Sequence, residues 1–553
     1  MNADRLIAHF GRISDAPDAV SKLRRFILDL AVRGKLVDQD PGEGTARDLL
    51  SQHSLTVETL DDSHAFAVPH AWVWATVGDV CSKTGSGSTP RGGKTAYVAK
   101  GTPFLRSQNV HDDGLRLDDV AYIDAATHRR MAGTAVQPDD LLLNITGGSM
   151  GRCCHISASF TEANISQHVA ILRAAIPGIQ AYLHACVISP YFQTLIFDEQ
   201  TGAGRGGLPK NKMDRLPIPL PPLAEQHRIV AKVDELMMLC DRLEASRAER
   251  ESRRDRLVLA SLNRLSQPTD PDEFKKNAGF TLSNLNRFST KPGHIKELRK
   301  AILNLAVSGR LVPQEEDNPP ATHLLTSIAQ KRQAGITTDS LHTAVPHDLP
   351  AGWVLATVQQ LLVAPTRNGV SLKGSDTPPG TKALRLNAIT DNGIDYTQHR
   401  FIPLTPKAEA DLAIVSGDFL IVRGNGSLRL VGKAALALDP PFTVIFPDTA
   451  IRLRLFDDPS LQAYVNMAWR SPWIRSKIES KARTTAGIFK ISQGDVEAVT
   501  IPLPPLAEQK RIVAKVDELM VICDQLEHHL ESQQKGRRQL LEALLHEALE
   551  GVG

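Results

Sequence analysis

Two segments begin like catalytic motifs and then depart from them. Gly93-Lys94-Thr95 ends like a phosphate-binding loop, but that loop needs a glycine where this chain has Ser88. His546-Glu547 begins like a zinc-protease helix, which needs a second histidine where this chain has Glu550. We therefore expect neither nucleotide binding nor zinc-dependent hydrolysis at these places.

Two further segments also fall short of catalysis. Asn318-Pro319-Pro320 is like the motif with which DNA amino-methyltransferases hold a flipped base, but Ala321 replaces the aromatic residue that stacks on it. We interpret this segment as a turn. The acidic and basic residues between Pro271 and Lys275 are too close together for a metal-dependent nuclease, and we expect them on the surface of a polar linker. The sequence thus offers no nucleophile or metal site.

The cysteines do not form a metal-binding or disulfide pattern. No Cys-x-x-Cys pair is present, and the adjacent Cys153-Cys154 is a poor unit for either role. We expect all of them to be reduced and mostly buried. They are Cys81, Cys153, Cys154, Cys186, Cys240 and Cys523.

A long internal repeat organises the elements that would have to position any site. Residues 218–244 recur as residues 501–527, and chance does not produce such a match. The substitutions between the two copies are His227/Lys510, Met238/Val521, Leu239/Ile522 and Arg242/Gln525.

The remainder of the two halves is repeated in the same order but more loosely. Each half begins with a short helix that ends at a glycine, continues with a mixed module and ends with a long helix. Short apolar runs such as residues 169–172 and 450–455, bounded by Gly and Pro, favour strands within the modules. The matching segments are 23–37 with 298–312, 72–77 with 353–358, and 140–149 with 418–427.

A long amphipathic helix is predicted after the paired prolines of each half. A helix over residues 223–265 would extend about 65 Å at 1.5 Å per residue, farther than one module can cover. We therefore favour antiparallel pairing of the two long helices over packing of each apolar stripe on its own module. The stripes are Ile229, Val233, Leu236, Cys240 and Leu243 in the first helix and Ile512, Val516, Leu519, Cys523, Leu526 and Leu530 in the second.

The outer part of the first long helix alternates arginine with acidic residues. This alternation predicts a solvated or partner-facing surface rather than a track for phosphate groups. The basic residues are Arg247, Arg250, Arg253, Arg254 and Arg256, and the acidic ones are Glu249, Glu251 and Asp255.

Composition limits the class of protein. The chain has 553 residues, a formal net charge of +2 and 42% hydrophobic residues, so we expect several folded domains and no overall basic character. The N-terminus lacks the features of a secretory signal, and no apolar stretch approaches the roughly 20 residues that cross a bilayer. We expect a cytoplasmic protein without membrane contact.

These observations predict an α+β fold with two tandem-repeated modules. Two long antiparallel coiled-coil helices join the modules, with pseudo-twofold symmetry. The expected boundaries are an N-terminal helical segment (1–67), a first module (68–217), a first long helix (218–265), a linker with a short helical segment (266–347), a second module (348–500) and a second long helix (501–553).

This scheme resembles the specificity subunits of Type I restriction–modification systems along nearly the whole chain. The order and duplication of the motifs make the match specific, and the Pro-Leu-Ala-Glu-Gln helix starts are the most specific of them. The segments that carry the resemblance are Gly34–Val37, the regions of Trp72 and Trp353, Leu142–Ser149, Pro222–Gln226 and Pro505–Gln509.

The resemblance implies a division of labour among subunits. Each module would be a target-recognition domain that reads one half of a split site in double-stranded DNA, and the long helices would act as a ruler. Two methyltransferase subunits would bind S-adenosylmethionine and modify adenine. Motor-nuclease subunits would use ATP and magnesium to translocate and cut. None of these cofactors is expected on this chain, which would not itself be an enzyme.

Candidate DNA contacts follow from the chemistry of base readout. Arginine suits guanine, asparagine and glutamine suit adenine, and glycine-rich turns let backbone amides approach phosphate. The candidates in the first module are Arg106, Gln108, Asn109, Thr146, Ser149, Arg152, Arg205, Lys210 and Lys212. Those in the second are Arg385, Asn387, Arg423, Asn425, Ser427, Arg429, Lys433, Arg483, Thr484 and Lys490.

Each candidate residue has a plainer alternative as an ordinary turn residue or a surface ion pair. Trp72 and Trp353 recur in both halves, so we expect them to anchor the cores rather than to read bases. Two other functions remain open: an orphan or modification-only DNA-binding module, and a coiled-coil scaffold that does not bind DNA. The apolar stripes and partner-binding faces also predict that the chain aggregates when it is alone.

Overall fold

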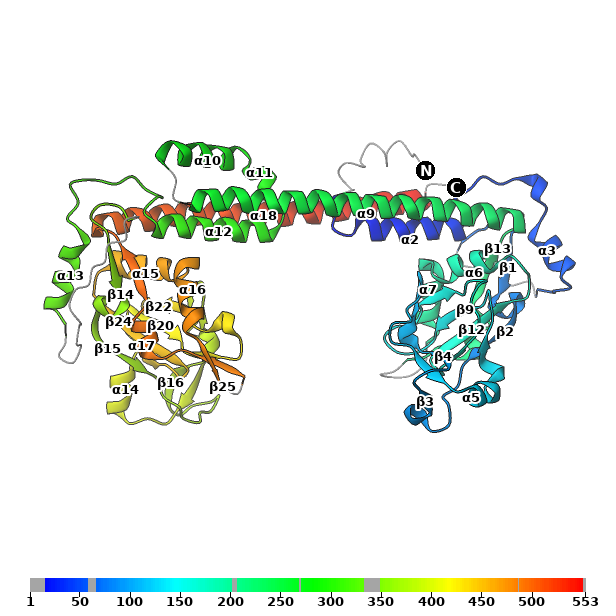
Figure 1. The fold of residues 1–553 in the computed structure, drawn as a ribbon, viewed down its shortest axis with the longest axis horizontal. Helices are drawn as coiled ribbons and strands as arrows, with labels where there is room; N and C mark the ends of the chain where they lie inside the picture. The colour runs from blue at the N-terminus through cyan, green and yellow to red at the C-terminus, as the bar shows by residue number, and fades with distance from the viewer. Residues whose placement is uncertain are drawn as a thin grey trace. The chain divides into compact units, whose positions relative to one another are not determined.

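The chain divides into two compact units (Figure 1). The first comprises Met1–Arg250 and Gln534–Gly553, and the second comprises Glu251–Gln533. Each unit therefore holds one module, the beginning of one long helix and the end of the other. The computed structural model describes residues 15–57, 66–200, 206–267, 270–332, 349–485 and 487–550.

A four-stranded antiparallel sheet, with strand order β10-β9-β12-β2, forms the centre of the first module. Leu141 and Leu143 pack in one hydrophobic cluster, whereas Leu142 packs in another. Because neighbouring strand residues point to opposite faces, this sheet is buried on both faces, which explains its uninterrupted apolar runs. The strands are β2 (Cys81–Ser86), β9 (Leu141–Asn144), β10 (Cys153–His155) and β12 (Val169–Ala174).

A five-stranded sheet, two strand pairs and several helices complete the first module. The five-stranded sheet has the order β3-β7-β4-β11-β8, in which β4 and β11 run parallel. Its strands are β3 (Tyr97–Val98), β4 (Thr102–Leu105), β7 (Ala121–Ile123), β8 (Ala135–Val136) and β11 (Ala163–Ile165). The other elements include the strand pair β1 (Val73–Thr76) and β13 (Pro217–Leu220), the helices α3 (Ala46–Gln52), α5 (Ala125–Arg130), α6 (Gln180–Val187), α7 (Pro190–Asp198) and α8 (Lys210–Met213).

The second module repeats this plan. Its central sheet has the order β15-β24-β20-β22, and Phe419 and Leu420 again face different hydrophobic clusters. A smaller sheet, β19-β16-β23, keeps the parallel pair. The strands are β14 (Val354–Thr357), β15 (Leu362–Asn368), β16 (Thr381–Leu384), β19 (His399–Ile402), β20 (Asp418–Val422), β22 (Ala434–Leu436), β23 (Val444–Ile445), β24 (Ala450–Leu455) and β27 (Thr500–Leu503).

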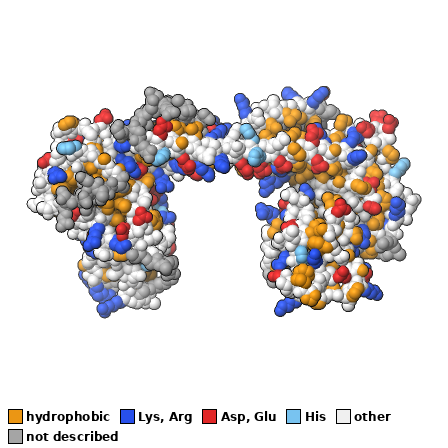
Figure 2. Space-filling model, turned by 180° about the vertical axis from the view of Figure 1, so that it is seen from behind, with side chains coloured by type: hydrophobic (Ala, Val, Ile, Leu, Met, Phe, Trp, Pro, Cys, Tyr) orange, Lys and Arg blue, Asp and Glu red, His pale blue; other side chains and the backbone are white. Residues whose placement is uncertain are grey.

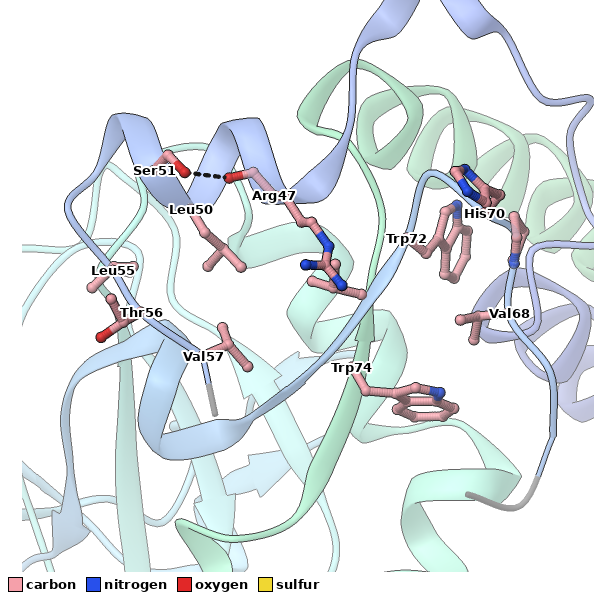
Figure 3. A pocket seen from close by; sticks show the side chains of 12 residues that line it. Arg47, Leu50, Ser51, Leu55, Thr56, Val57, Val68, His70, Trp72 and Trp74 are labelled. Atoms are coloured by element: carbon pink, nitrogen blue, oxygen red, sulfur yellow. Dashed lines mark hydrogen bonds between the residues drawn. The ribbon is translucent and has the colours of Figure 1, made fainter. Parts of the chain in front are cut away.

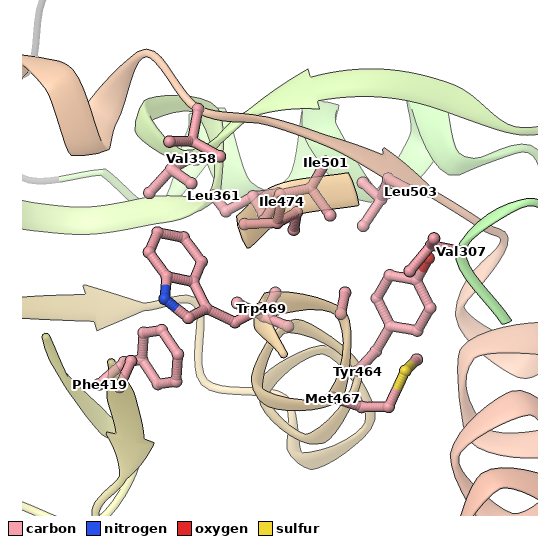
Figure 4. Close-up of a cluster of buried hydrophobic side chains, with 14 of the residues drawn as sticks. Val307, Val358, Leu361, Phe419, Tyr464, Met467, Trp469, Ile474, Ile501 and Leu503 are labelled. Atoms are coloured by element: carbon pink, nitrogen blue, oxygen red, sulfur yellow. The ribbon is translucent and has the colours of Figure 1, made fainter. Parts of the chain in front are cut away.

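Helices pack aromatic side chains onto the second central sheet (Figure 4). Trp469 lies edge-on to Phe419 with ring centroids 5.5 Å apart, and its indole nitrogen donates to the carbonyl of Gly432 at 2.8 Å. Such a contact combines a large apolar burial with a satisfied polar atom. The helices are α13 (Ala321–Gln330), α14 (Pro406–Leu412), α15 (Pro459–Trp469), α16 (Pro472–Lys481) and α17 (Gln493–Glu497). The strand and module predictions for this half are confirmed at the level of an α+β fold.

In the first unit, the short helix α2 (Ala19–Val32) contacts both long helices, α9 (Leu223–Ser266) and α18 (Leu506–Glu550). Along α9 the contacts run in reverse order, because Arg247 binds the carbonyl of Ala16 whereas Arg24 binds Asp241. Along α18 they run in the same order. The segments of α9 and α18 in this unit are therefore antiparallel to each other. The contacts to α18 are those of Asp18 with Arg538, Lys22 with Glu542 and Lys35 with the carbonyl of Leu549.

The second unit repeats this arrangement with α12 (Pro292–Val307). Here α12 runs antiparallel to α18, since Arg299 binds Asp524 and Gln314, beyond the helix, binds Glu508. It runs parallel to the end of α9. The contacts to the end of α9 are those of Lys291 and His294 with Asp255 and of Arg310 with the carbonyl of Gln267.

The packing of the apolar stripes corrects one sequence-based interpretation. Ile229 and Val233 lie against α2 and against Trp72 and Tyr182 of the first module. Ile512 and its stripe likewise join the core of the second module. The length of the helices argued against packing of each apolar stripe on the module of its own half. The structure shows that such packing does occur, over the first turns of each long helix.

The glycine that ends each short helix is required by the junction with its module. Gly34 and Gly309 have φ angles of +67° and +72°, in the left-handed region that favours glycine. A Cβ at Gly34 would lie 2.4 Å from Cγ of Pro69, and one at Gly309 would lie 2.3 Å from Cγ of Pro350. Each junction therefore needs glycine both for its backbone conformation and for space.

Several predicted boundaries differ from the structure. Strands β13 and β27 pair with β1 and β14, so the modules extend to residues 220 and 503, and the long helices begin only after the second proline. The predicted linker also contains two helices before α12, namely α10 (Pro271–Ser283) and α11 (Leu285–Phe288). Residues 271–275 are thus a helix start rather than linker, because the side chain of Asp270 accepts hydrogen bonds from the first-turn amides.

The arginine-rich part of α9 is engaged within each unit. Arg250 pairs with Asp15 at 3.0 Å in the first unit, and Arg254 pairs with Glu251 at 2.7 Å in the second. In the part of the chain that the structure describes, no helix is both long and apolar enough to cross a membrane.

Candidate nucleic-acid interface

The candidate loops of the first module converge on one edge of its central sheet. This edge is formed by the end of β9, the start of β12 and the end of β2, because Asn144 pairs with Val169 and Ser86 pairs with Ala170. The loop after β9 and the segment before α8 also meet there, through an antiparallel bridge between Thr146 and Gly207. Segments far apart in sequence thus share one surface.

The glycine-rich loop after β9 is open to solvent. A Cβ at Gly147 or Gly148 would meet no atom within 4 Å, so another molecule can approach the backbone closely. The hydroxyl of Thr146 lies 2.6 Å from Nδ1 of His168, and Arg152 is exposed. Of the predicted residues, Thr146, Ser149 and Arg152 therefore lie together.

Two polar residues that lie at this edge, Asn144 and His168, were not predicted from the sequence. The side-chain amide of Asn144 donates to the carbonyl of Ser107 at 2.8 Å and to the hydroxyl of Ser149 at 3.2 Å. It joins the first candidate loop to the glycine-rich loop. His168 orients Thr146. Both flank apolar strand runs, and only the strand register shows that they face the same loop.

The first loop of this module is held by an acidic partner. Arg106 donates to the carbonyl of Asp119 at 2.9 Å, and Gln108 donates to its carboxylate at 2.6 Å. Asn109 is only 2% exposed, because its side chain bridges the amide of Arg106 and the carbonyl of Arg116. The expectation that Asn109 makes an external contact is therefore wrong, since its amide closes the loop.

The lysines near α8 are ion-paired. Lys210 bonds Asp214 at 2.5 Å and Thr84 at 2.8 Å, and Lys212 pairs with Glu199 at 2.7 Å. Surface pairs of this kind contribute at most about 1 kcal/mol, so a phosphate group can compete with them. Arg205 lies outside the described residues.

In the second module the first loop has the same construction. The guanidinium of Arg385 pairs with Asp376 and donates to the carbonyl of His399 at 3.3 Å. Asn387 is exposed and donates to the side chain of Gln398 at 3.1 Å. Both predicted residues therefore lie on the surface, in a loop stabilised by its own hydrogen bonds.

The second loop of this module turns around Asn425. Its side-chain oxygen accepts from the amide of Ser427 at 3.0 Å, while Ser427 and Arg429 are exposed. Arg423 is partly buried and donates to the carbonyl of Asp448 at 3.4 Å, so it braces the loop. Lys433 pairs with Asp391 at 3.3 Å.

The third loop is a short hairpin that pairs with the second. Strands β21 (Gly424–Asn425), β26 (Ile488–Lys490) and β25 (Arg483–Thr485) form a sheet in that order. Arg483, Thr484 and Lys490 are exposed on it. The structure therefore brings two of the predicted loops together in this module, as the Thr146–Gly207 bridge does in the first.

Glycine is required where the edge strand of each central sheet leaves the sheet. A Cβ at Gly87 or Gly369 would lie 2.0 Å from a carbonyl oxygen, that of Ile165 or Phe446 respectively. The chain therefore crosses directly over the start of the neighbouring segment. This crossing fixes the position of the residues that follow at the candidate surface.

Charge is local rather than global. Figure 2 shows basic and acidic side chains interspersed over the face that it draws, as the net charge of +2 leads one to expect. Half of the candidate cations that the structure describes are paired with carboxylates. Among the candidate cations that the structure describes, those without an ion pair within 4.0 Å are Arg152, Arg423, Arg429, Arg483 and Lys490.

A cavity of about 500 Å³ lies between α3 and the start of β1 in the first unit (Figure 3). Ser51 donates to the carbonyl of Arg47 at 2.8 Å, so its hydroxyl is occupied by its own helix. The polar groups of the lining do not form a nucleophile–base pair. The lining residues are Arg47, Leu50, Ser51, Leu55, Thr56, Val57, Val68, Pro69, His70, Trp72, Val73 and Trp74.

The described residues contain no group of three or more His, Cys, Asp and Glu side chains able to hold a metal ion. The cysteines are free, and all but Cys81 are buried, as predicted. Burial raises the pKa of the Cys81 and Cys154 thiols to about 12, so both remain protonated at neutral pH.

The glutamate of the Pro-Leu-Ala-Glu-Gln motif joins the long helix to the module through side-chain hydrogen bonds, and we call this glutamate the latch carboxylate. Glu225 accepts from the indole of Trp72 at 3.0 Å and from Gln39 at 2.7 Å. Burial raises the pKa of Glu225, although these two donors oppose the rise. Trp72 is 4% exposed, which confirms its role in the core rather than in base contact.

The second half repeats this latch. Glu508 accepts from Trp353 at 3.0 Å and from Gln314 at 2.8 Å, and burial raises its pKa in the same way. The most specific motif of the repeat therefore joins a module to a long helix and does not belong to the exposed loops.

Comparison with known proteins gives relatives along the whole chain. The specificity subunit of the Type I restriction enzyme EcoEI of Escherichia coli is 24% identical, and the match covers 96% of this chain and 94% of the relative. The EcoAI specificity subunit of Escherichia coli is 23% identical with the same coverage of both chains. No family model matches the chain.

A solved structure is also similar. That structure concerns complex assembly and conformational transition of the type I R-M system. The match covers 88% of this chain and 99% of that chain, with 18% identity and a TM-score of 0.48. By its sequence relatives alone, the chain is a homologue, over nearly all of its length, of the specificity subunits of Type I restriction enzymes.

Proposed function

We propose that this chain is the sequence-specific DNA-recognition subunit of a Type I restriction–modification complex. Each module is a target-recognition domain that reads one half of a bipartite, asymmetric site. The observation that carries this proposal is a repeated scaffold with unlike exposed loops, in a chain homologous to specificity subunits over 96% of its length. Equal scaffolds hold the two readers in the same way, and unlike loops read unlike sequences.

The chemistry belongs to partner subunits in this proposal. Two methyltransferase subunits hold S-adenosylmethionine and modify adenine, while motor-nuclease subunits use ATP and magnesium. The chain itself contributes binding and positioning, in the cytoplasm. The long helices set the distance between the half-sites, and the pseudo-twofold relation of the halves is part of this proposal.

The repeated helix starts support two copies of one partner. Residues 223–243 and 506–526 have the same pattern of buried and exposed positions. Five of the nine exposed positions keep their identity, and the four substitutions all lie at exposed positions. Conserving a buried face in both copies is required by packing alone. Conserving an exposed face in both copies is expected when the same molecule binds twice.

Each of these faces carries an exposed apolar pair. Met238 and Leu239 are 53% and 46% exposed, and Val521 and Ile522 occupy the matching positions on α18. The two pairs differ in residue type but both are apolar, as expected of an interface core. They also account for the prediction that the chain aggregates when it is alone.

The test is co-expression with the methyltransferase subunit encoded beside it, followed by mapping of methyladenine in host DNA. We expect one split motif with two unlike halves and a fixed gap. A complex that forms without methylating DNA would indicate an inactive partner, and duplex binding would then be measured directly. Failure both to form a complex and to bind duplex DNA would favour the scaffold alternative.

Partner docking can be tested separately. We expect Met238→Asp to remove one methyltransferase copy, Val521→Asp the other, and the double variant both, as measured by native mass spectrometry. Leu438→Asp, at an exposed position of the second module, is the matched control. Unchanged stoichiometry in the double variant would show that the partner binds elsewhere.

A further inference from the structure

The hairpin of strands β25 and β26 lies in the second module, where β25 is labelled in Figure 1, and it has several exposed side chains. Ile488 and Lys490 are exposed, while Phe489 packs against the module core and Ile491 is 3% exposed. Because side chains alternate along a strand, Ile488 and Lys490 point to the same side, away from the core. Ile488 is thus an apolar residue held outward by a well-anchored strand.

Two cations stand directly opposite each other on this hairpin. Arg483 pairs with Lys490 in the antiparallel register. Directly opposed like charges destabilise a strand pair. The structure gives neither cation an ion pair within 4.0 Å among the described residues, in contrast to Lys433, which pairs with Asp391. An external anion would relieve this repulsion.

The neighbouring acid, Asp495, interacts electrostatically with Arg483, but among the described residues it forms no ion pair with either cation within 4.0 Å. Asp495 bonds the amide and the hydroxyl of Ser492, at 2.9 and 2.6 Å, and so caps helix α17. Burial acts to raise the pKa of Asp495, but the bonds from Ser492 and the charges of Arg483 and Lys481 outweigh it and lower the pKa. The hydrogen bonds from Ser492 therefore hold the Asp495 carboxylate at the start of α17, and its charge offsets the repulsion between the two cations only in part.

The hairpin is fixed to the edge of the central sheet. The amide of Ile491 donates to the carbonyl of Arg423 at 3.0 Å, and the amide of Arg423 donates to the carbonyl of Thr449 at 2.7 Å. Gly424, opposite Lys490, leaves space for the lysine stem, since a Cβ there would lie 3.2 Å from Cγ of Lys490. The exposed face thus has a defined position on the module.

The first module has the same connection with different side chains. Its bridge between Thr146 and Gly207 matches that between Gly424 and Lys490. In the repeat, the residue two before Gly207 is Arg205, where the second module has Ile488. The backbone bridge is retained while the residue type at this position of the sequence differs, as expected where two modules must read different sequences.

We propose that Ile488 is a specificity-determining residue that contacts a thymine methyl group in the major groove, while Arg483 and Lys490 bind the adjacent phosphates. This inference rests on the proposed function and names residues that perform it. A two-stranded ribbon fits the major groove, and the thymine methyl is the apolar feature of a base edge there. A DNA phosphate bound between Arg483 and Lys490 would offset the repulsion between these two cations.

The experiment uses the complex of the full chain with its methyltransferase subunits and a duplex that carries the methylated motif. Each thymine of the half-site read by the second module is replaced in turn by uracil, which lacks the methyl group. We expect one replacement to weaken binding about tenfold in the wild type. In the Ile488→Ala complex the same replacement should have no effect, although overall binding is weaker.

The two cations give a different signature. Arg483→Ala and Lys490→Ala should weaken binding to all sequences alike and should reduce the slope of log affinity against log salt by about one each. Leu438→Ala is the control, because Leu438 follows β22 at the opposite end of the central sheet and is also exposed. It should leave both signatures unchanged.

The outcomes separate the two proposals. A wild-type complex that recognises a split motif, but whose methyl dependence is absent or survives in Ile488→Ala, overturns the role of Ile488 and leaves the recognition function standing. A wild-type complex that neither methylates nor binds any motif overturns both. Retained folding of each variant is checked by its thermal unfolding.

Discussion

The two modules agree in their buried contacts and differ in their exposed loops. A buried carboxylate binds an arginine through two hydrogen bonds in each central sheet: Asp140 with Arg173 at 2.7 and 2.8 Å, and Asp418 with Arg454 at 2.8 and 2.9 Å. At the surface, by contrast, the loops share their backbone pairing and a few side chains, such as Arg106 and Arg385, but differ at most other positions. The difference teaches that one scaffold can hold two readers whose side chains vary independently.

Exchange of a whole module should have the largest effect. Replacing residues 68–220 with the corresponding module of a homologue should change one half of the methylated motif completely and leave the other half and the gap unchanged. The reason is that the hydrophobic cluster on one face of each central sheet is made entirely of residues of its own module. Methyladenine sequencing measures the result, and a change in both halves would contradict independent reading.

Loss of the buried carboxylate should be the next largest effect, and it should be equal in the two modules. Asp140→Asn and Asp418→Asn each leave an arginine without its charged partner in a site where the Asp is fully buried. We expect a loss of about 3 kcal/mol in the free energy of unfolding. Chemical denaturation of both variants measures it, and clearly unequal losses would show that the scaffolds are not equivalent.

The crossing glycines offer a smaller and equally matched test. Gly87→Ala and Gly369→Ala place a methyl group 2.0 Å from a backbone oxygen, so the crossing chain must move. We expect about 2 kcal/mol of destabilisation and weaker DNA binding by the altered module. Thermal unfolding measures the loss of stability, and duplex binding measures the loss of affinity for DNA. Gly148→Ala is the control, because a Cβ at Gly148 would meet no atom within 4 Å. Normal stability of both crossing variants would contradict the close approach.

The latch carboxylates should produce the smallest effect, seen as a dependence on pH. The pKa values of Glu225 and Glu508 are raised in the folded state, so the unfolded chain releases these protons first as the pH rises. The stability that they contribute is therefore present below the unfolded pKa of about 4.3 and is lost as the pH rises through the folded value.

Replacing either latch carboxylate should make the decrease in folding stability with rising pH smaller. We expect Glu225→Gln and Glu508→Gln to reduce the fall in unfolding temperature above about pH 4.3, each by an amount worth about 1 kcal/mol or less. Unfolding temperatures measured over this pH range give the result. A steeper fall in either variant would mean that its carboxylate is not the source of the dependence.

The sequence alone determined the repeat, the order of the elements and the mixed character of the modules. The long helix predicted to end at residue 265 ends at Ser266, because its pattern continues without Pro or Gly. The residues of a repeated motif stand next to one another in the chain, so periodicity and composition are enough to find them. The same holds for the glycine that ends each short helix.

Only the tertiary structure decided which polar residues face outward. Asn109 and Lys490 belong to similar clusters in the sequence, yet Asn109 closes a buried turn whereas Lys490 stands exposed on a hairpin. Asn144 was missed because its partners, Ser107 and Ser149, come from two different loops. Exposure and pairing depend on strand register across distant segments, and no local pattern encodes that register.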